Sequence, residues 1–152
     1  MPDYFFDTSA LGKNYHNEVG RPKVEQLLRE PGARHFISRL SVIEIQSVFA
    51  GKVRTGVISE SDFGTLRRRL LTDVARRRLD VVRMSGLHYQ EAERLIRKHA
   101  MSYSLRTLDA IQLTVVLDLC ARGLLNHFVC ADRNLCKVAV SEALTVINPE
   151  IP

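Results

Sequence analysis

The sequence has few cysteines, no long apolar run and fewer acidic than basic side chains. The three cysteines are odd in number and show no C-x-x-C spacing, which argues against a disulfide framework and predicts buried, reduced thiols. The longest apolar stretch, residues 111–119, is interrupted by polar residues and falls short of the roughly 20 apolar residues that span a bilayer. The start of the chain lacks the charged and apolar regions of a signal peptide. We therefore expect a cytoplasmic protein without a membrane span.

Zinc ligands are also scarce. The five histidines lie far apart and form no H-x-x-x-H pair, so the sequence gives little support to a zinc site. Any bound metal would have to be held by oxygen atoms.

The composition is that of a folded domain with a basic surface. The 152 residues are 45% hydrophobic and 26% charged, which predicts one domain over residues 1–152 with a sizeable core. Lys and Arg number 22 against 17 Asp and Glu, a net charge of +5. Two arginine triplets, 67–69 and 76–78, fall in one expected helix. They indicate a polyanionic partner or, alternatively, a solvated helix face.

Short apolar runs alternate with longer amphipathic stretches along the chain. Strands are predicted at 4–6, 35–38, 79–82, 127–130 and 144–147. Helices are predicted after the first strand to residue 15, from 20–22 to 31–32, from 42 to a stop at 51, and over 56–78, 87–99, 107–123 and 133–140. Leu108 is expected on the buried stripe of the helix that begins at Thr107. This pattern predicts an α/β fold, an open and mainly parallel sheet of about five short strands with helices on both faces.

Four acidic residues fall where such a fold gathers ligands. Asp7 and Asp132 follow predicted strands, and Glu44 and Asp109 fall in the first turns of predicted helices. All four face one crevice at the carboxyl edge of the sheet if the first and fourth strands are neighbours. Clustered carboxylates repel one another unless a cation compensates them, and Mg²⁺ or Mn²⁺ prefers such oxygen ligands.

Each acid taken alone has a simpler interpretation. Ser41 and Glu44 fit a capping box, and Asp132 fits an ordinary helix N-cap. Asp109 fits an acidic residue that stabilises a helix N-terminus. Asp7 is harder to explain structurally, because it follows a buried aromatic run where a charge needs a partner.

The residues around these acids carry a family resemblance. Residues 5–11, FFDTSAL, followed by Lys13, Tyr15 and Glu18, resemble the opening of PIN-domain proteins, particularly the toxin ribonucleases of VapBC toxin-antitoxin pairs. Residues 41–45, SVIEI, look like the second acidic motif, 105–113, LRTLDAIQL, like the third, and 128–132, FVCAD, like the fourth. The resemblance covers essentially the whole chain, in family order. It implies a PIN-like, Rossmann-like fold.

The resemblance implies specific roles. Asp7, Glu44, Asp109 and Asp132 would be the catalytic metal ligands for Mg²⁺ or Mn²⁺, and Ser9 would orient the first acid, with Thr8 a weaker candidate for that role. Residues flanking the third and fourth acids would contact substrate, and these are Arg106, Arg133 and Asn134. The arginines have the alternative role of neutralising the carboxylates.

The chain departs from the family pattern at two positions. Cys130 stands where family members often have Thr or Ser, and Asn134 stands where they often have a further acid. A second metal site therefore lacks one acid, although Asn134 still offers a neutral oxygen.

The expected function is metal-dependent endonucleolytic hydrolysis of RNA by a toxin. The resemblance implies a small antitoxin partner whose tail covers the acidic crevice, and a homodimer or a hetero-oligomer with that antitoxin. Two alternatives stay open. One is a non-catalytic module that binds RNA or protein through its basic helix, and the other is cleavage of DNA, whose phosphodiester is much alike.

Overall fold

A parallel five-stranded sheet forms the centre of the molecule. The computed structural model describes residues 2–152. The strand order is β3-β2-β1-β4-β5, and every neighbouring pair is parallel. The strands are β1 (Asp3–Phe6), β2 (Arg34–Ser38), β3 (Asp80–Val82), β4 (His127–Val129) and β5 (Val146–Ile147). The predicted α/β fold is confirmed, and β1 and β4 are the neighbours that a shared crevice requires.

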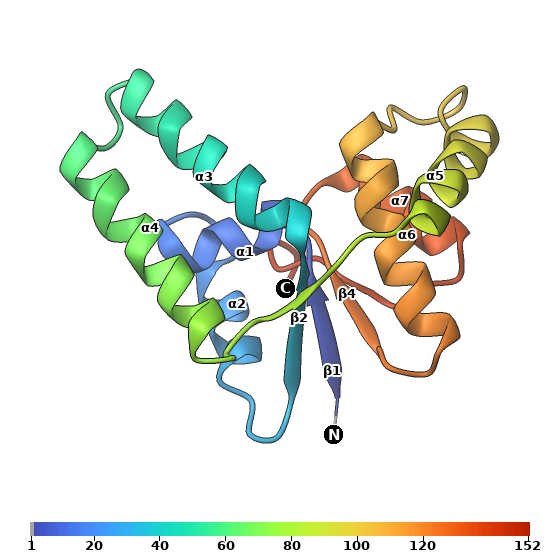
Figure 1. Ribbon diagram of the computed structural model, residues 1–152, viewed down its shortest axis with the longest axis horizontal. Coiled ribbons are helices and arrows are strands. Elements are labelled where there is room, and N and C mark those ends of the chain that lie inside the picture. The colour runs from blue at the N-terminus through green and yellow to red at the C-terminus, as the bar shows by residue number, and fades with distance from the viewer. Residues whose placement is uncertain (1) are drawn as a thin grey trace.

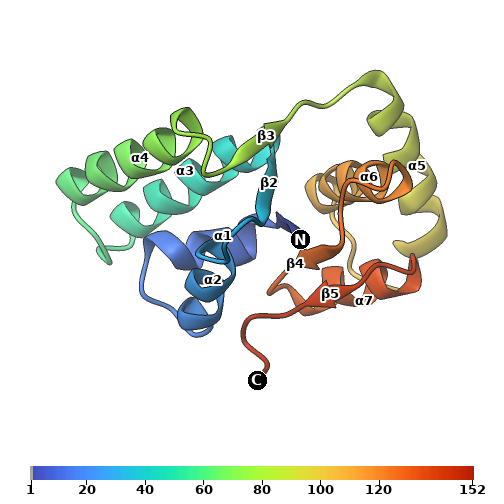
Figure 2. The same ribbon diagram turned by 90° about the horizontal axis from the view of Figure 1, so that it is seen from below.

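Helices cover both faces of this sheet. They are α1 (Thr8–Tyr15), α2 (Arg21–Leu28), α3 (Arg39–Arg54), α4 (Glu60–Ala75), α5 (Gly86–His99), α6 (Thr107–Ala121) and α7 (Arg133–Ser141). Helices α1 to α4 lie on one side and α5 to α7 on the other, as Figure 1 and the view from below in Figure 2 both show. Within residues 2–152, no helix is long and apolar enough to cross a membrane.

Two hydrophobic cores result from the alternation of side chains along the strands. Phe5 and Phe128 pack with the group that contains α5, α6 and α7. Tyr4, Phe6 and Ile37 pack with the group that contains α1 to α4. Phe5 and Phe6 are both completely buried, and burial of one such side chain stabilises the fold by roughly 1.5–3 kcal/mol. The aromatic run before Asp7 thus fixes the central strand from both sides.

The helix predicted over 56–78 is shorter than expected at both ends. It begins at Glu60 because Ser59 and Asp62 form a capping box, in which each side chain accepts a hydrogen bond from the other's backbone N–H, at 3.0 and 2.9 Å. It ends at Ala75, so only the arginines 67–69 lie on α4, and 76–78 follow it in a turn where Arg77 has a φ of 55°. The expectation that one helix carries both triplets is wrong.

Other boundaries differ for local reasons. Helix α3 continues past Gly51 and stops before Gly56, whose φ of 76° suits the residue that follows a helix end. The third, fourth and last strands are shorter than predicted, because only β3, β4 and β5 as bounded above are paired in the sheet. Leu108 is 46% exposed and does not join the core, whereas residues 112–116 of α6 are buried on every side of the helix.

Candidate active site

The first and fourth acids meet where two neighbouring strands end. The backbone N–H of Asp7, directly after β1, donates to the carbonyl of Val129, the last residue of β4, at 2.9 Å. Asp132 follows three residues later and caps α7. Parallel pairing of β1 with β4 therefore brings the Asp7 and Asp132 segments to the same edge of the sheet.

Asp7 is a buried carboxylate held by hydrogen bonds. Its side chain is the N-cap of α1, and Oδ2 accepts from the backbone N–H of Ser9 at 3.1 Å and from the Ser9 hydroxyl at 2.5 Å. Oδ1 accepts from Nε2 of Gln112 at 3.3 Å. Burial raises the pKa of the Asp7 carboxyl, and these hydrogen bonds offset only part of that rise. The site therefore holds an acid whose charge lacks a compensating cation.

Glu44 is not part of a helix cap. The N-cap of α3 is Ser38, whose Oγ accepts from the backbone N–H of Ser41 at 3.2 Å. The capping box expected from Ser41 and Glu44 is therefore absent, since α3 begins earlier than the sequence indicated. Glu44 lies in the second turn of α3 rather than in its first turn. Helix capping therefore does not explain the presence of an acid at position 44.

The Glu44 side chain turns toward the other acids instead. The Thr8 hydroxyl lies 3.0 Å from Glu44 Oε1 and donates to it. Burial raises the pKa of Glu44, and the charges of Asp7 and Asp109 raise it further. Thr8 thus takes an orienting position toward the second acid, while Ser9 takes one toward the first.

Asp109 and Asp132 share one arginine. Arg106 Nε lies 3.3 Å from Asp109 Oδ2, and its Nη2 lies 3.7 Å from Asp132 Oδ2. Burial raises the pKa of Asp109, and the charge of Asp7 adds to the rise, whereas Arg106 opposes it. The Arg106 side chain is 75% exposed, so solvent screens much of its compensation. The expected neutralising role of Arg106 matches these contacts.

Asp132 combines a structural and a site position. Its Oδ1 accepts from the backbone N–H of Leu135 at 3.1 Å, as an N-cap does, while Oδ2 faces Arg106. The capping interpretation was correct, but it uses only one of the two oxygens. The other oxygen remains directed toward the acidic cluster.

The departure at Cys130 changes the inner wall of the site. The Ser9 hydroxyl donates to Asp7 and also accepts from the backbone N–H of Ala131 at 3.1 Å, so it links the first acid to the segment of the fourth. The Cys130 thiol lies 3.8 Å from Asp7 Oδ2 and 3.9 Å from the Ser9 hydroxyl. A weakly polar thiol therefore occupies a place beside the buried acid.

Gln112 lies in the third motif and in the interrupted apolar run 111–119, but the sequence did not predict it as a site residue. Its side chain is 1% exposed, and Nε2 donates to Ser41 Oγ at 2.7 Å as well as to Asp7. Its Oε1 accepts from the Ser38 hydroxyl. The available signal was a long polar side chain in the middle of a core helix, which needs partners of its own.

Arg133 and Asn134 are exposed in the first turn of α7. In the part of the chain that the structure describes, neither side chain is hydrogen-bonded or ion-paired with the four acids. Their side chains are therefore free to contact a substrate beside the carboxylate cluster, as the sequence predicted, and that contact remains a prediction.

Comparison with known proteins decides the family. A family model described as PIN domain matches residues 4–148. The chain belongs to the PIN domain family. The matched range includes Asp7, Glu44, Asp109 and Asp132. No curated protein sequence matches this PIN domain.

Solved structures share the fold of this PIN domain at low sequence identity. A chain of a toxin-antitoxin complex from Klebsiella pneumoniae aligns with a TM-score of 0.62 and 16% identity, over 96% of this chain and 97% of that one. A VapC toxin of Mycobacterium tuberculosis, described as cleaving the sarcin-ricin loop, aligns with 0.64 and 13%, over 88% and 93%. A VapBC complex of Rickettsia felis bound to a promoter DNA fragment aligns with 0.63 and 13%, over 96% and 98%.

The donor set of this PIN domain fits one kind of metal. Across residues 2–152, no three Asp, Glu, His or Cys side chains converge tightly enough to hold an ion by themselves, which is what zinc requires. Mg²⁺ and Mn²⁺ keep several waters and bind through one or two carboxylates. Repulsion among Asp7, Glu44 and Asp109 raises the pKa of the last two acids, and burial raises all three. A hydrated divalent ion would relieve that cost.

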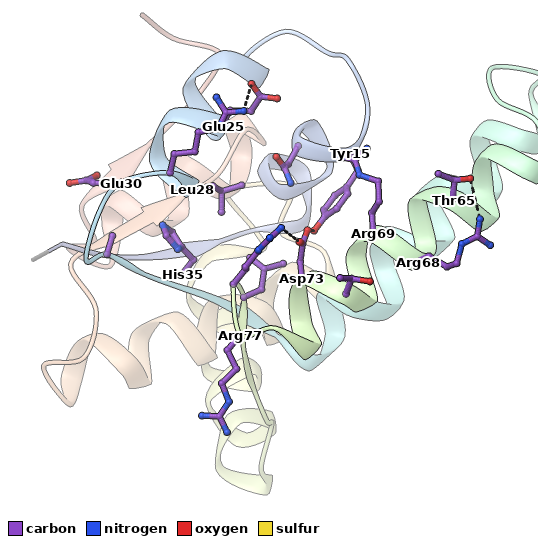
Figure 3. Close-up of a pocket in the computed structure, with 16 residues that line it drawn as sticks. Tyr15, Glu25, Leu28, Glu30, His35, Thr65, Arg68, Arg69, Asp73 and Arg77 are labelled. Atoms are coloured by element: carbon purple, nitrogen blue, oxygen red, sulfur yellow. Dashed lines mark hydrogen bonds and ion pairs between the residues drawn. The ribbon is translucent and has the colours of Figure 1, made fainter.

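A separate cavity of this PIN domain, here called the α2–α4 cavity, lies away from the acids. It has a volume of about 780 Å³ between α1, α2 and α4, and none of the four acids lines it. Figure 3 shows Arg69 beside Tyr15, and Asp73 facing Tyr15 near the end of α4. His35 and Leu79 place this cavity near the amino ends of β2 and β3. The acids lie at the carboxyl ends of the strands, and the α2–α4 cavity thus lies toward their amino ends.

Proposed function

We propose that this PIN domain is a divalent-metal-dependent endoribonuclease that acts as the toxin of a toxin-antitoxin pair. The observation that carries the proposal is the buried, uncompensated Asp7 beside three further acids at the carboxyl edge of the sheet. A binding surface without chemistry has no use for clustered carboxylates, because their charges repel one another and repel RNA. The solved structures named as toxins support the same function.

Asp7 and Asp109 would be the principal metal-holding residues, with Asp132 Oδ2 and Glu44 completing the set. When bound, Mg²⁺ or Mn²⁺ supplies positive charge to a phosphoryl oxygen and lowers the pKa of a nearby water. Ser9 keeps the Asp7 carboxylate in one orientation, as its hydrogen bonds to Asp7 and Ala131 require.

Glu44 is the proton acceptor in this proposal. The Thr8 hydroxyl donates to Oε1 and thereby fixes the orientation of the Glu44 carboxylate. In the hydrolysis, the water oxygen bonds to phosphorus, the bond to one ribose oxygen breaks, the water proton passes to Glu44, and the leaving ribose oxygen takes up a proton from solvent. Arg106 and Arg133 contact phosphate oxygens at either side of Asp132.

The test is metal-dependent cleavage of a pool of structured cellular RNAs. Purified protein free of antitoxin is incubated with Mg²⁺, with Mn²⁺ and with chelator, beside folded Asp7→Asn and Asp109→Asn variants. Asp118→Asn is the matched control, since Asp118 lies on α6 with Asp109 but faces His88 and Arg122. We expect defined cuts from the unaltered protein and Asp118→Asn only. Equal cleavage by Asp7→Asn and Asp109→Asn would refute the proposal.

The toxin role adds three expectations. Expression in a bacterial cytoplasm arrests growth unless Asp109 is replaced by Asn, and a cognate antitoxin relieves the arrest. We also propose assembly as a homodimer or with the antitoxin, because the exposed apolar side chains Ile43 and Val48 of α3 offer a surface. Sedimentation of the purified protein measures that state. DNA of the same sequence serves as the competing substrate in the cleavage assay.

One observation favours the competing function of a non-catalytic module. Arg68, Arg69 and Arg77 line the α2–α4 cavity (Figure 3), and among the described residues none of the three forms an ion pair. Such a surface binds RNA or an acidic protein whether or not the acids act. RNA binding without a cut under every metal condition would support this function instead.

A further inference from the structure

A second groove opens at the same edge of the sheet as the acids. Its volume is about 750 Å³, and α7, β5, the C-terminal segment and Lys23 of α2 form its walls. Arg133 and Lys137 line it from α7. Arg133 directly follows Asp132, so the groove begins one residue from the fourth acid. The fourth acid and the first cation of the groove therefore both lie at the start of α7.

The charged side chains of the groove are all basic. No acidic side chain lines it, and in residues 2–152 Lys23, Arg133 and Lys137 form no ion pair. The α2–α4 cavity differs, because Glu25, Glu30 and Asp73 stand among its arginines and Asp73 pairs with Arg78 at 3.2 Å. Three basic side chains that form no ion pair, with no acidic side chain among them, make this groove the stronger anion-binding candidate.

The cations continue outward from the site in a row. Arg106 contacts Asp109 and Asp132 at the crevice, and Arg133 stands at the start of α7. Lys137 lies four residues further, on the same side of the helix. A strand with its reacting phosphate at the acids can thus place successive phosphates along α7 toward Lys23.

The apolar floor of the groove indicates how such a strand binds. Val140 is 61% exposed and Ile151 is 62% exposed, and Val146 and Ile147 lie between the charged walls. No aromatic side chain is among the lining residues, so the groove has no platform on which bases stack. Contact with phosphates and ribose edges fits these residues, and it tolerates any base sequence.

We propose that this groove binds the phosphate backbone of the RNA strand on one side of the scissile bond, through Arg133, Lys137 and Lys23. The inference rests on the proposed ribonuclease function and specifies how its substrate is held. Each phosphate contact with a single strand contributes about 0.7 to the slope of log affinity against log salt concentration. Loss of all three cations therefore reduces that slope by about 2.

The first experiment measures RNA affinity at several salt concentrations in an Asp109→Asn background, where the RNA stays uncut. Arg133→Gln, Lys137→Gln, Lys23→Gln and the triple variant are compared with Arg97→Gln, which removes one exposed charge from α5. Thermal unfolding verifies each fold. We expect the slope to fall by about 0.7 for each groove substitution and to stay unchanged for Arg97→Gln.

The second experiment places neutral methylphosphonate linkages on either side of the cleavage site. Neutral linkages on one side alone should weaken binding to the Asp109→Asn protein, and they should have no effect on the triple variant. Slopes unchanged in the groove variants, or equal effects of neutral linkages on both sides, would overturn the inference. Groove variants that keep their RNA affinity but no longer bind an acidic protein partner would also overturn it. RNA affinity that is lost in Arg68→Gln and retained in the groove variants would overturn it as well. Failure of the proposed function is separate, because it leaves RNA uncut by the unaltered protein.

Discussion

Replacing Gln112 by leucine tests whether one buried amide organises the acidic site. The substitution keeps a similar volume and removes three hydrogen bonds, to Asp7, Ser41 and Ser38. Two neutral hydrogen bonds contribute about 1 kcal/mol each, and the bond to a charged carboxylate contributes about 2 kcal/mol. A buried leucine regains about 1 kcal/mol through apolar burial. The expected loss of folding free energy is therefore about 3 kcal/mol.

The matched control is Thr114→Val on the same helix. Thr114 is also 1% exposed, but its hydroxyl donates only to the carbonyl of Ile111 at 2.6 Å. That carbonyl lies in the helix, where it has a backbone partner as well. We expect Thr114→Val to cost less than about 1.5 kcal/mol. Urea unfolding of metal-free protein at neutral pH measures both values.

The activity of Gln112→Leu gives an independent measurement. Loss of the donor to Oδ1 removes one of the hydrogen bonds that hold down the raised pKa of Asp7, so the acid limb of the pH–activity profile should move to higher pH. Loss of an orienting partner typically lowers metal affinity or activity about 10- to 100-fold. A Gln112→Leu protein as stable as Thr114→Val, with an unchanged pH profile, would refute the reasoning.

Three further substitutions and conditions separate structural from chemical roles. Asp132→Asn should retain the N-cap and the stability of the protein while it loses RNA cleavage. Asp132→Ala should lose cleavage and also about 1 kcal/mol of folding free energy. Unfolding and RNA cleavage measure the two effects, and equal stability of the two variants would contradict the cap. Burial raises the pKa values of Asp7, Glu44 and Asp109 in the folded protein. In metal-free protein, the stability contributed by their neutral forms is therefore fully present below the pKa of the unfolded chain, about 4, and is lost as pH rises through the raised pKa values of the folded protein. Mn²⁺ should therefore raise the melting temperature more at pH 8 than at pH 5, and a larger rise at pH 5 would count against carboxylate binding. Gly20→Ala should destabilise the protein by about 2 kcal/mol or more, because φ is +90° and the new Cβ would lie 2.9 Å from the Pro149 carbonyl oxygen. Gly123→Ala is the control, since φ is +70° but the space around the new Cβ is open. It should cost about 1 kcal/mol in the same unfolding assay.

The sequence alone determined the elements and the residues of chemical interest. Apolar runs such as 4–6 and helix signals such as Thr107 and Gly123 act over a few residues, so they are readable without a fold. The acids Asp7 and Asp132 could be placed at the carboxyl ends of strands for the same reason. Boundaries were less accurate where two local signals compete, as at Gly51 and Gly56, and the second arginine triplet fell outside its expected helix.

Tertiary structure decided which of these residues meet. The pairing of β1 with β4 joins residues more than 120 positions apart, and the chain between them carries no local signal of that pairing. The same long-range packing makes Gln112 the partner of Asp7 and Ser41, and sets Lys23 opposite α7. Periodicity is a property of neighbouring residues, whereas burial, pKa and the convergence of side chains depend on every element that packs around them. For this reason the sequence named the acids, and the fold alone revealed the network and the groove around them.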